Sequence, residues 1–175
     1  MQSDKKVRDM MVGIFEYPHI PYWFSIEQVI RIVKISFLSS KKYPYPLVIM
    51  VFDEKYNLLG TVTLKEILKG IEPRLSSPVT KAQDTEEEEA AGLSIILDAL
   101  FKNEFRELIK KPIKEIMVPA KFFVEPDDPI TKAVYLIIHH DLPLLPVLEE
   151  KKKFVGLVRM IEVFDELSNI ILKEQ

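Results

Sequence analysis

Residues 154–164 of the chain read FVGLVRMIEVF, and residues 58–68 read LLGTVTLKEIL. In both stretches two apolar residues precede a glycine, and a glutamate follows that glycine by six positions. A second pair of similar stretches lies upstream in the same order, VRDMM at residues 7–11 and IKEIM at residues 113–117. Two matching pairs in one order indicate an internal duplication, and such repeats decide the fold.

The two copies differ in length. Met11 precedes Gly60 by 49 positions, whereas Met117 precedes Gly156 by 39, and such differences usually lie in loops. Each copy nevertheless predicts the same elements. In the second copy a short apolar run at 122–124 is followed by a helix from residue 130, strands at 144–148 and 154–158, and a last helix.

Residues that begin and end helices support these elements. In the first copy Ser25 and Gln28 form a capping-box pattern, and Gly70 is a suitable end for a short helix that begins at about residue 64. In the second copy Asp128 suits an N-cap, with Pro129 at the first helical position. A strand is expected from Pro46 to Phe52, followed by a turn and a returning strand.

The order β-α-β-β-α predicts a mixed α/β (α+β) fold with helices on one face of a small sheet. One copy would expose apolar surface that a second copy buries. We expect one domain at residues 1–71 and another at 111–175. Residues 72–110 would form an acidic linker, with four consecutive glutamates at 86–89, and an amphipathic helix at 93–110. That helix either packs on the core of its own chain or docks a partner.

Composition sets limits on function. The chain has 175 residues, of which 47% are hydrophobic and 29% charged, with a net charge of −3, as is ordinary for a soluble globular protein. The absence of cysteine excludes disulfides and thiolate chemistry. Because there is neither a run of about 18 apolar residues nor an N-terminal signal, we expect a cytoplasmic protein without membrane insertion.

The second copy resembles a CBS domain, the family named after the regulatory region of cystathionine β-synthase. The resemblance rests on PIKEIMVP at 112–119, VEP at 124–126, ITKA at 130–133, LPLLPVL at 142–148 and FVGLV at 154–158. The first copy is similar more weakly, through residues 7–11 and 58–68. The ordered, duplicated set of motifs carries the resemblance, rather than any single motif.

This resemblance implies a stand-alone CBS pair folded as one pseudo-two-fold Bateman module, commonly a homodimer. It implies clefts for adenosine compounds such as AMP, ADP, ATP or S-adenosylmethionine as regulatory ligands, with no required cofactor. It also implies a non-enzymatic role in which the ligand level modulates an unknown partner protein in trans.

The family pattern places a hydroxyl residue and, three positions later, an aspartate near the ligand ribose and phosphate. The carboxylate would accept charge-assisted hydrogen bonds from the ribose hydroxyls. The matching residues are Thr63 and Glu66 in the first copy, and Arg159 and Glu162 in the second. Arg159 would either fill the second cleft or bind a phosphate. Alternatively, Thr63 and Glu66 only form a capping box, and Glu162 lies on a solvated helix face.

The resemblance places the adenine base beside backbone groups and apolar side chains near the strands. The corresponding residues are Tyr22, Pro46 and Leu47 in the first copy and Val124, Pro143 and Leu144 in the second. The same residues would also be buried in a module with empty clefts.

Other functions are less favoured. The sequence has no phosphate-binding glycine loop and no nucleophile elbow, so we do not expect an enzyme. His139 and His140 are adjacent and would point about 100° apart on a helix, so no metal site is expected. Two alternatives remain open, a ligand-free CBS scaffold for dimerisation or protein interaction, and, with less support, a nucleic-acid-binding adaptor that uses lysines at 41–42 and 151–153.

Overall fold

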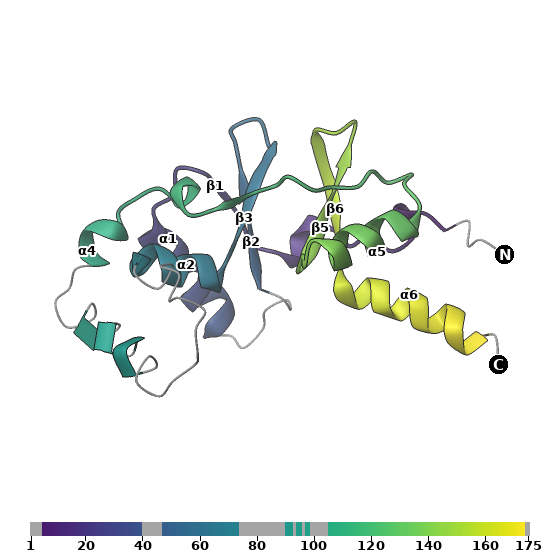
Figure 1. The fold of residues 1–175 in the computed structure, drawn as a ribbon. Coiled ribbons are helices and arrows are strands. Elements are labelled where there is room, and N and C mark those ends of the chain that lie inside the picture. The colour runs from purple at the N-terminus through teal and green to yellow at the C-terminus, as the bar shows by residue number, and fades with distance from the viewer. Residues whose placement is uncertain are drawn as a thin grey trace. The chain divides into compact units, whose positions relative to one another are not determined.

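The structure is a computed structural model that describes residues 5–39, 47–73, 90–92, 94–95, 97–98 and 105–173. Its main helices and strands follow the predicted β-α-β-β-α order twice (Figure 1). The first repeat has β1 (His19–Pro21), α1 (Ile26–Ile32), β2 (Val48–Phe52), β3 (Leu58–Thr63) and α2 (Leu64–Ile71). The second has β4 (Val118–Pro119), α5 (Ile130–His139), β5 (Leu144–Glu149), β6 (Lys153–Arg159) and α6 (Met160–Lys173). The predicted mixed α/β fold is confirmed.

Shorter helical segments connect these elements. They are η1 (Val7–Asp9), η2 (Ile14–Glu16), the π-helix η3 (Val33–Leu38), α4 (Phe105–Leu108) and η5 (Ile113–Glu115). The structure describes only parts of the amphipathic helix expected at 93–110, and α4, within that range, contacts α2. The acidic run at 86–89 and Pro46 lie outside the described residues.

The strands form two sheets. One has four strands in the order β1-β2-β3-β4, with β1 parallel to β2, and the other is the antiparallel pair β5-β6. All five residues of β2 are buried, which agrees with its uninterrupted apolar sequence VIMVF. Within one compact unit the β2–β3 and β5–β6 hairpins stand side by side (Figure 1), and the rings of Phe52 and Phe154 meet edge to face at 5.6 Å.

The first strand that the sequence predicted for the second repeat, at 122–124, is present only as an isolated bridge. In this bridge Val124 pairs in parallel with Val147 of β5, as β1 pairs in parallel with β2. β4 lies earlier, at Val118–Pro119, and is the neighbour of β3. The amide of Ala120 donates to the carbonyl of Leu59 at 3.1 Å. An apolar run predicts extended backbone, but it does not determine which strand will pair with it.

The helix caps confirm one prediction and correct two. The Ser25 amide donates to Gln28 Oε1 at 2.8 Å, and the Gln28 amide donates to Ser25 Oγ at 3.2 Å, as the capping box requires. Asp128 does not cap α5, because Pro129 occupies the cap and Asp128 Oδ2 accepts from the Glu125 amide at 2.7 Å. Gly70 does not end α2, which continues to Ile71.

The described chain divides into two compact units. The first comprises Met1–Pro21, Pro44–Thr61 and Pro119–Gln175, so it contains both hairpins and the helices of the second repeat. Residues 5–12 belong to it through hydrogen bonds to the second repeat. The Val7 amide donates to the Asp128 carbonyl at 2.9 Å, and Val12 exchanges two backbone hydrogen bonds with Leu157, at 2.9 and 3.0 Å. The segment before the first repeat therefore packs against the second repeat.

The second unit comprises Tyr22–Tyr43 and Val62–Val118, and it contains α1 and α2. Here the segment before the second repeat packs against helices of the first. The Ile113 amide donates to the Phe24 carbonyl at 2.6 Å, and the Ile26 amide donates to the Lys111 carbonyl at 3.0 Å. Ile26 and Ile113 have no exposed surface. A Cβ atom on Gly70 would lie 2.9 Å from Ile116 Cγ2, so glycine serves this close packing.

Candidate functional site

In the first repeat, Thr63 and Glu66 cap the start of α2. The Thr63 amide donates to Glu66 Oε2 at 2.9 Å, and the Thr63 hydroxyl donates to the same oxygen. The Lys65 amide donates to Thr63 Oγ1 at 3.2 Å. The capping box that the sequence pattern allowed is therefore present. Within the described part of the chain, Oε1 of Glu66 accepts no hydrogen bond.

The second repeat has the same cap with a different partner. The Arg159 amide donates to Glu162 Oε2 at 3.0 Å, as the Thr63 amide does to Glu66. In addition, Arg159 Nε lies 2.8 Å from each Glu162 carboxylate oxygen, and a second guanidinium nitrogen contacts Oε1. The Arg159 and Glu162 side chains are 17% and 15% exposed. Glu162 therefore does not lie on a solvated helix face, because it forms a largely buried ion pair with Arg159.

The surroundings of Arg159 stabilise the charged form of its guanidinium. The hydrogen bonds that the Arg159 guanidinium donates to Glu162 raise its pKa, partial burial opposes that shift, and the Tyr17 hydroxyl adds to it. Tyr17 is 2% exposed and belongs to a buried cluster with β2 residues Val48 and Met50. No sequence motif indicated Tyr17, because 142 positions separate it from Arg159.

The residues expected near the adenine base lie in unlike surroundings. The side chains of Val124 and Leu144 are buried in two separate hydrophobic clusters. Pro143 is exposed, Leu47 is half-buried, and Pro46 lies outside the described residues. Tyr22 is half-buried, and Lys114 Nζ lies 5.4 Å from the centre of its ring. Val124 and Leu144 thus belong to the core of the first unit, whereas Tyr22 belongs to the second.

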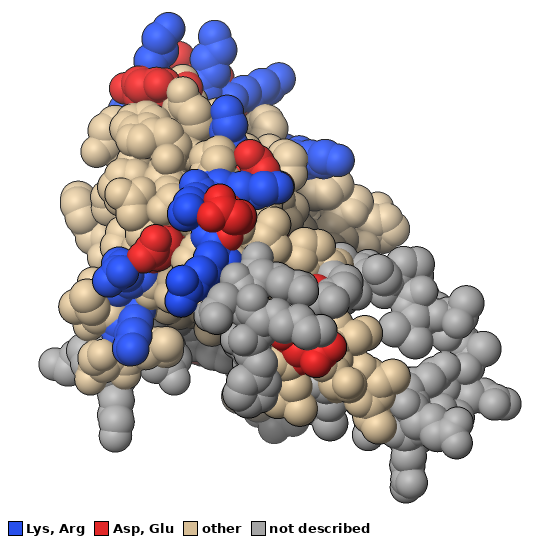
Figure 2. Space-filling view, turned by 90° about the vertical axis from the view of Figure 1, so that its left-hand side faces the viewer, with Lys and Arg blue, Asp and Glu red and all other residues tan. Residues whose placement is uncertain are grey.

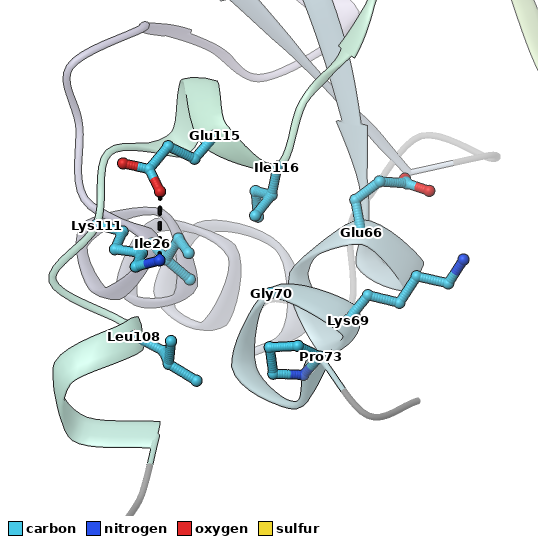
Figure 3. A pocket seen from close by; sticks show the side chains of 9 residues that line it. All are labelled: Ile26, Glu66, Lys69, Gly70, Pro73, Leu108, Lys111, Glu115 and Ile116. Carbon is cyan, nitrogen blue, oxygen red and sulfur yellow. Dashed lines mark ion pairs between the residues drawn. The ribbon is translucent and has the colours of Figure 1, made fainter. Parts of the chain in front are cut away.

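A pocket of about 340 Å³ lies beside α2 within the second unit (Figure 3). Glu66 is one of its lining residues. Apolar side chains from α1, α4 and the segment before the second repeat form much of its wall, together with a residue of α2 and one that lies two positions after this helix. These lining residues are Ile26, Gly70, Pro73, Leu108 and Ile116.

Charged groups complete the pocket lining. Lys69 follows Glu66 by three positions, so both side chains leave the same face of α2. On the opposite wall Lys111 Nζ lies 3.5 Å from Glu115 Oε2 (Figure 3). Sequence reasoning missed Lys69 and Lys111. The helical spacing from Glu66 could have indicated Lys69, whereas Lys111 reaches the pocket only through tertiary packing.

Figure 2 shows that basic and acidic side chains alternate on the face it displays, including over the upper hairpin tips. Lys153 at one tip lies 3.3 Å from Glu149. Among the described residues, no three His, Asp or Glu side chains are grouped so that they could hold a metal ion. In the same part of the chain, no helix is long and apolar enough to cross a lipid bilayer.

Comparison with known proteins adds a family match and a set of similar folds. Residues 113–169 match the family model of the CBS domain. No curated protein matches the chain. The CBS-pair protein CBSX2 from Arabidopsis thaliana is 16% identical, with a TM-score of 0.62 and 99% of each chain covered.

Two similar structures contain nucleotides. CBSX2 in complex with AMP has a TM-score of 0.61 at 16% identity, covering 94% of this chain and 97% of that one. The cytosolic domain of the Mg²⁺ channel MgtE in complex with ATP has a TM-score of 0.60 at 20% identity, covering 94% of this chain and 49% of that one. At these identities the likeness shows the fold alone.

Residues 113–169 thus match the CBS domain family over about one third of the chain. Its two β-α-β-β-α repeats give it the fold of a CBS pair. The resemblance stated from the sequence is confirmed.

Proposed function

We propose that the protein is a non-enzymatic regulatory CBS pair that senses an adenine nucleotide at the pocket beside α2. The observation that carries this proposal is the position of Glu66. This residue lines the pocket, and only one of its carboxylate oxygens is used by the helix cap. A carboxylate with an available oxygen suits the ribose hydroxyls, because charge-assisted hydrogen bonds are the strong ones.

The other lining groups support a ligand with an apolar end and an anionic end. The pocket volume of about 340 Å³ lies within the range of small-molecule sites, roughly 300–1,000 Å³. Apolar side chains such as Ile26 and Leu108 would contact a base, while Lys69, on the same wall as Glu66, would meet phosphates. Thr63 would position Glu66 through the cap. The expected base contacts of Tyr22, Pro46 and Leu47 stay predictions.

The similar structures support the same class of ligand. CBSX2 binds AMP and the MgtE cytosolic domain binds ATP in the structures compared above. By analogy we propose AMP, ADP, ATP or S-adenosylmethionine as the regulatory ligand. Binding would change how the protein contacts a partner that it regulates in trans. Repeat domains at 1–71 and 111–175, the linker at 72–110, and a cytoplasmic location remain part of this proposal.

Thermal unfolding with a ligand panel tests the proposal. At a ligand concentration about 100 times Kd, a ligand that binds only the folded state should raise Tm by roughly 5–10 °C. The panel contains AMP, ADP, ATP and S-adenosylmethionine, with GMP for base selectivity. No rise in Tm with any adenine compound at millimolar concentration would overturn the proposal.

Paired variants locate the site. Glu66→Gln keeps an oxygen for the Thr63 amide but removes the negative charge, so it should weaken binding of every adenosine compound. Lys69→Ala should weaken ATP binding more than adenosine binding, because only ATP carries phosphates. Lys65→Ala is the matched control, since Lys65 lies on the same helix but does not line the pocket. Equal losses for Lys65→Ala and Lys69→Ala would place the ligand elsewhere.

A ligand-free scaffold is the second candidate function, and the surface of α6 favours it. Apolar residues on this helix are strongly exposed, among them Ile161 at 57%, Phe164 at 65% and Ile171 at 64%. Exposed apolar stripes of this kind mark interaction surfaces. We propose that α6 pairs two copies of the chain as a homodimer, which is compatible with either function.

A further inference from the structure

The equivalent glutamates of the two repeats, Glu66 and Glu162, differ in the hydrogen bonds that their carboxylates accept. Glu66 and Glu162 both accept a hydrogen bond from the amide three positions earlier, at 2.9 and 3.0 Å. Glu66 uses one oxygen for its cap. Glu162 uses both, because the Arg159 guanidinium contacts Oε1 and Oε2. The duplication has therefore left one carboxylate with an available acceptor and one that is saturated.

The Arg159–Glu162 pair is also held in place. An arginine remains charged at every ordinary pH, so the pair cannot be released by deprotonation of the guanidinium. The side chains are 17% and 15% exposed, and the nearly buried Tyr17 hydroxyl interacts with Arg159. A ligand hydroxyl at Glu162 would have to displace at least one guanidinium hydrogen bond. Removal of one partner from a buried pair is costly, because the other charge is left unpaired.

We infer that Arg159 closes the second repeat to the ligand, so that each chain binds one nucleotide, at the first repeat. This inference rests on the proposed function, since it concerns the same ligand. Arg159 thus acts as a specificity-determining residue that sets the stoichiometry. The opposite possibility is that the guanidinium turns to bind a phosphate, in which case the second repeat would contribute a ligand site of its own.

Isothermal titration calorimetry with AMP distinguishes these cases. We compare wild type with Arg159→Thr, which gives the second repeat the Thr-x-x-Glu pattern of the first. The expected stoichiometry is one AMP per chain for wild type and two for Arg159→Thr. Glu66→Gln alone should bind no AMP, because it removes the site of the first repeat. The double variant Glu66→Gln/Arg159→Thr should bind one AMP, at the second repeat.

Control variants distinguish closure of the second repeat by Arg159 from the general effects of losing a charge or of misfolding. Arg31→Thr removes the same charge from an exposed ion pair, where Arg31 lies 2.6 Å from Glu27, and should leave the stoichiometry at one. Circular dichroism checks folding. If Arg159→Thr does not fold, Arg159→Gln keeps a side chain that can hydrogen-bond to Glu162 but lacks the charge, and should also permit the second site.

The outcomes separate the inference from the proposed function. One AMP in wild type and still one in Arg159→Thr and in Arg159→Gln would overturn closure and leave the proposed function intact. Two AMP in wild type would also overturn closure. No AMP in wild type but one in Arg159→Thr would overturn the proposed site and support closure. No binding by any folded variant would overturn both.

Discussion

Gly156 in β6 lies so close to the backbone of Val12 that an added Cβ atom would stand 2.8 Å from the Val12 carbonyl oxygen. This contact occurs because Val12 exchanges hydrogen bonds with Leu157, the next residue along β6. The glycine that identified the duplication in the sequence thus has a steric role. Because Gly156 has no side chain, the segment before the first repeat can pack directly against the β5–β6 hairpin of the second repeat.

Gly156→Ala should therefore destabilise the protein. Because the clashing atom belongs to the backbone, the Val12 segment must shift, and overpacking of this kind costs about 1–3 kcal/mol. Urea denaturation followed by circular dichroism measures the change. Gly13→Ala is the matched control, because nothing lies within 4 Å of its added Cβ atom and its effect should stay within about 0.5 kcal/mol. Equal effects of the two substitutions would contradict the steric role.

The two helix caps should differ in their contribution to stability. Glu66→Ala removes a cap and should lower the free energy of unfolding by about 1 kcal/mol. Glu162→Ala removes a cap and also leaves the largely buried Arg159 charge without its carboxylate, so the loss should be larger, about 2–4 kcal/mol. Urea denaturation of both variants tests this difference. A double-mutant cycle with Arg159→Ala should show coupling, and additive losses would contradict it.

The ion pairs between the N-terminal segment and Asp127 should contribute to the stability of the protein, and this contribution should depend on pH and salt. The Asp127 carboxylate contacts Arg8 and lies 2.7 Å from Lys6 Nζ, and the hydrogen bond from Lys6 is the main cause that lowers the pKa of Asp127. A lowered pKa in the folded state stabilises the protein above the unfolded pKa, near 3.8, and this contribution disappears as the pH falls through the folded value.

Asp127→Asn should accordingly lower Tm at pH 7 in low salt, and the difference from wild type should shrink at pH 2–3 and in about 1 M NaCl. Differential scanning calorimetry across these conditions provides the measurement. Asp165→Asn serves as the comparison, because Asp165 has no ion pair among those found in the described chain. A Tm difference for Asp127→Asn that persists at low pH would rule out the charge interaction as its cause.

The exposed stripe of α6 should determine the oligomeric state. Phe164→Lys places a charge in the centre of the stripe and should convert the proposed dimer to a monomer in analytical ultracentrifugation, because burial of that charge would carry a desolvation penalty. Asn169→Lys introduces the same charge on an exposed position outside the apolar stripe and should leave the dimer intact. A wild-type protein that is monomeric at micromolar concentration would show that α6 does not pair two copies.

Local patterns could be predicted well from this sequence. The Ser25–Gln28 capping box, the turn between β2 and β3, and the β-α-β-β-α order depend on residues within a few positions of one another. Asp128 and Gly70 were misjudged for a common reason. Both have a residue type that suits a cap, but neighbours in space gave them other contacts, a loop amide for Asp128 and the side chain of Ile116 for Gly70.

Long-range contacts could not be predicted in the same way. β4 lies beside β3, and the segments before the two repeats each pack against the other repeat, because backbone hydrogen bonds are formed with whichever edge the fold brings near. The residues that line the pocket could not be predicted from the sequence either. Leu108 reaches it from the range that the sequence presented as a linker helix, and Lys111 reaches it from the start of the predicted second domain.

The sequence by itself determined the duplication and indicated the cap at the start of α2, since a carboxylate three positions after the cap residue reaches the amide of that residue. Only the tertiary structure decided which group, if any, binds the other oxygen of that carboxylate. At Glu66 that oxygen belongs to a residue lining a pocket, whereas at Glu162 it is bound by Arg159 beside the buried Tyr17. Burial and neighbours distant in the chain set that difference, and no local pattern encodes them.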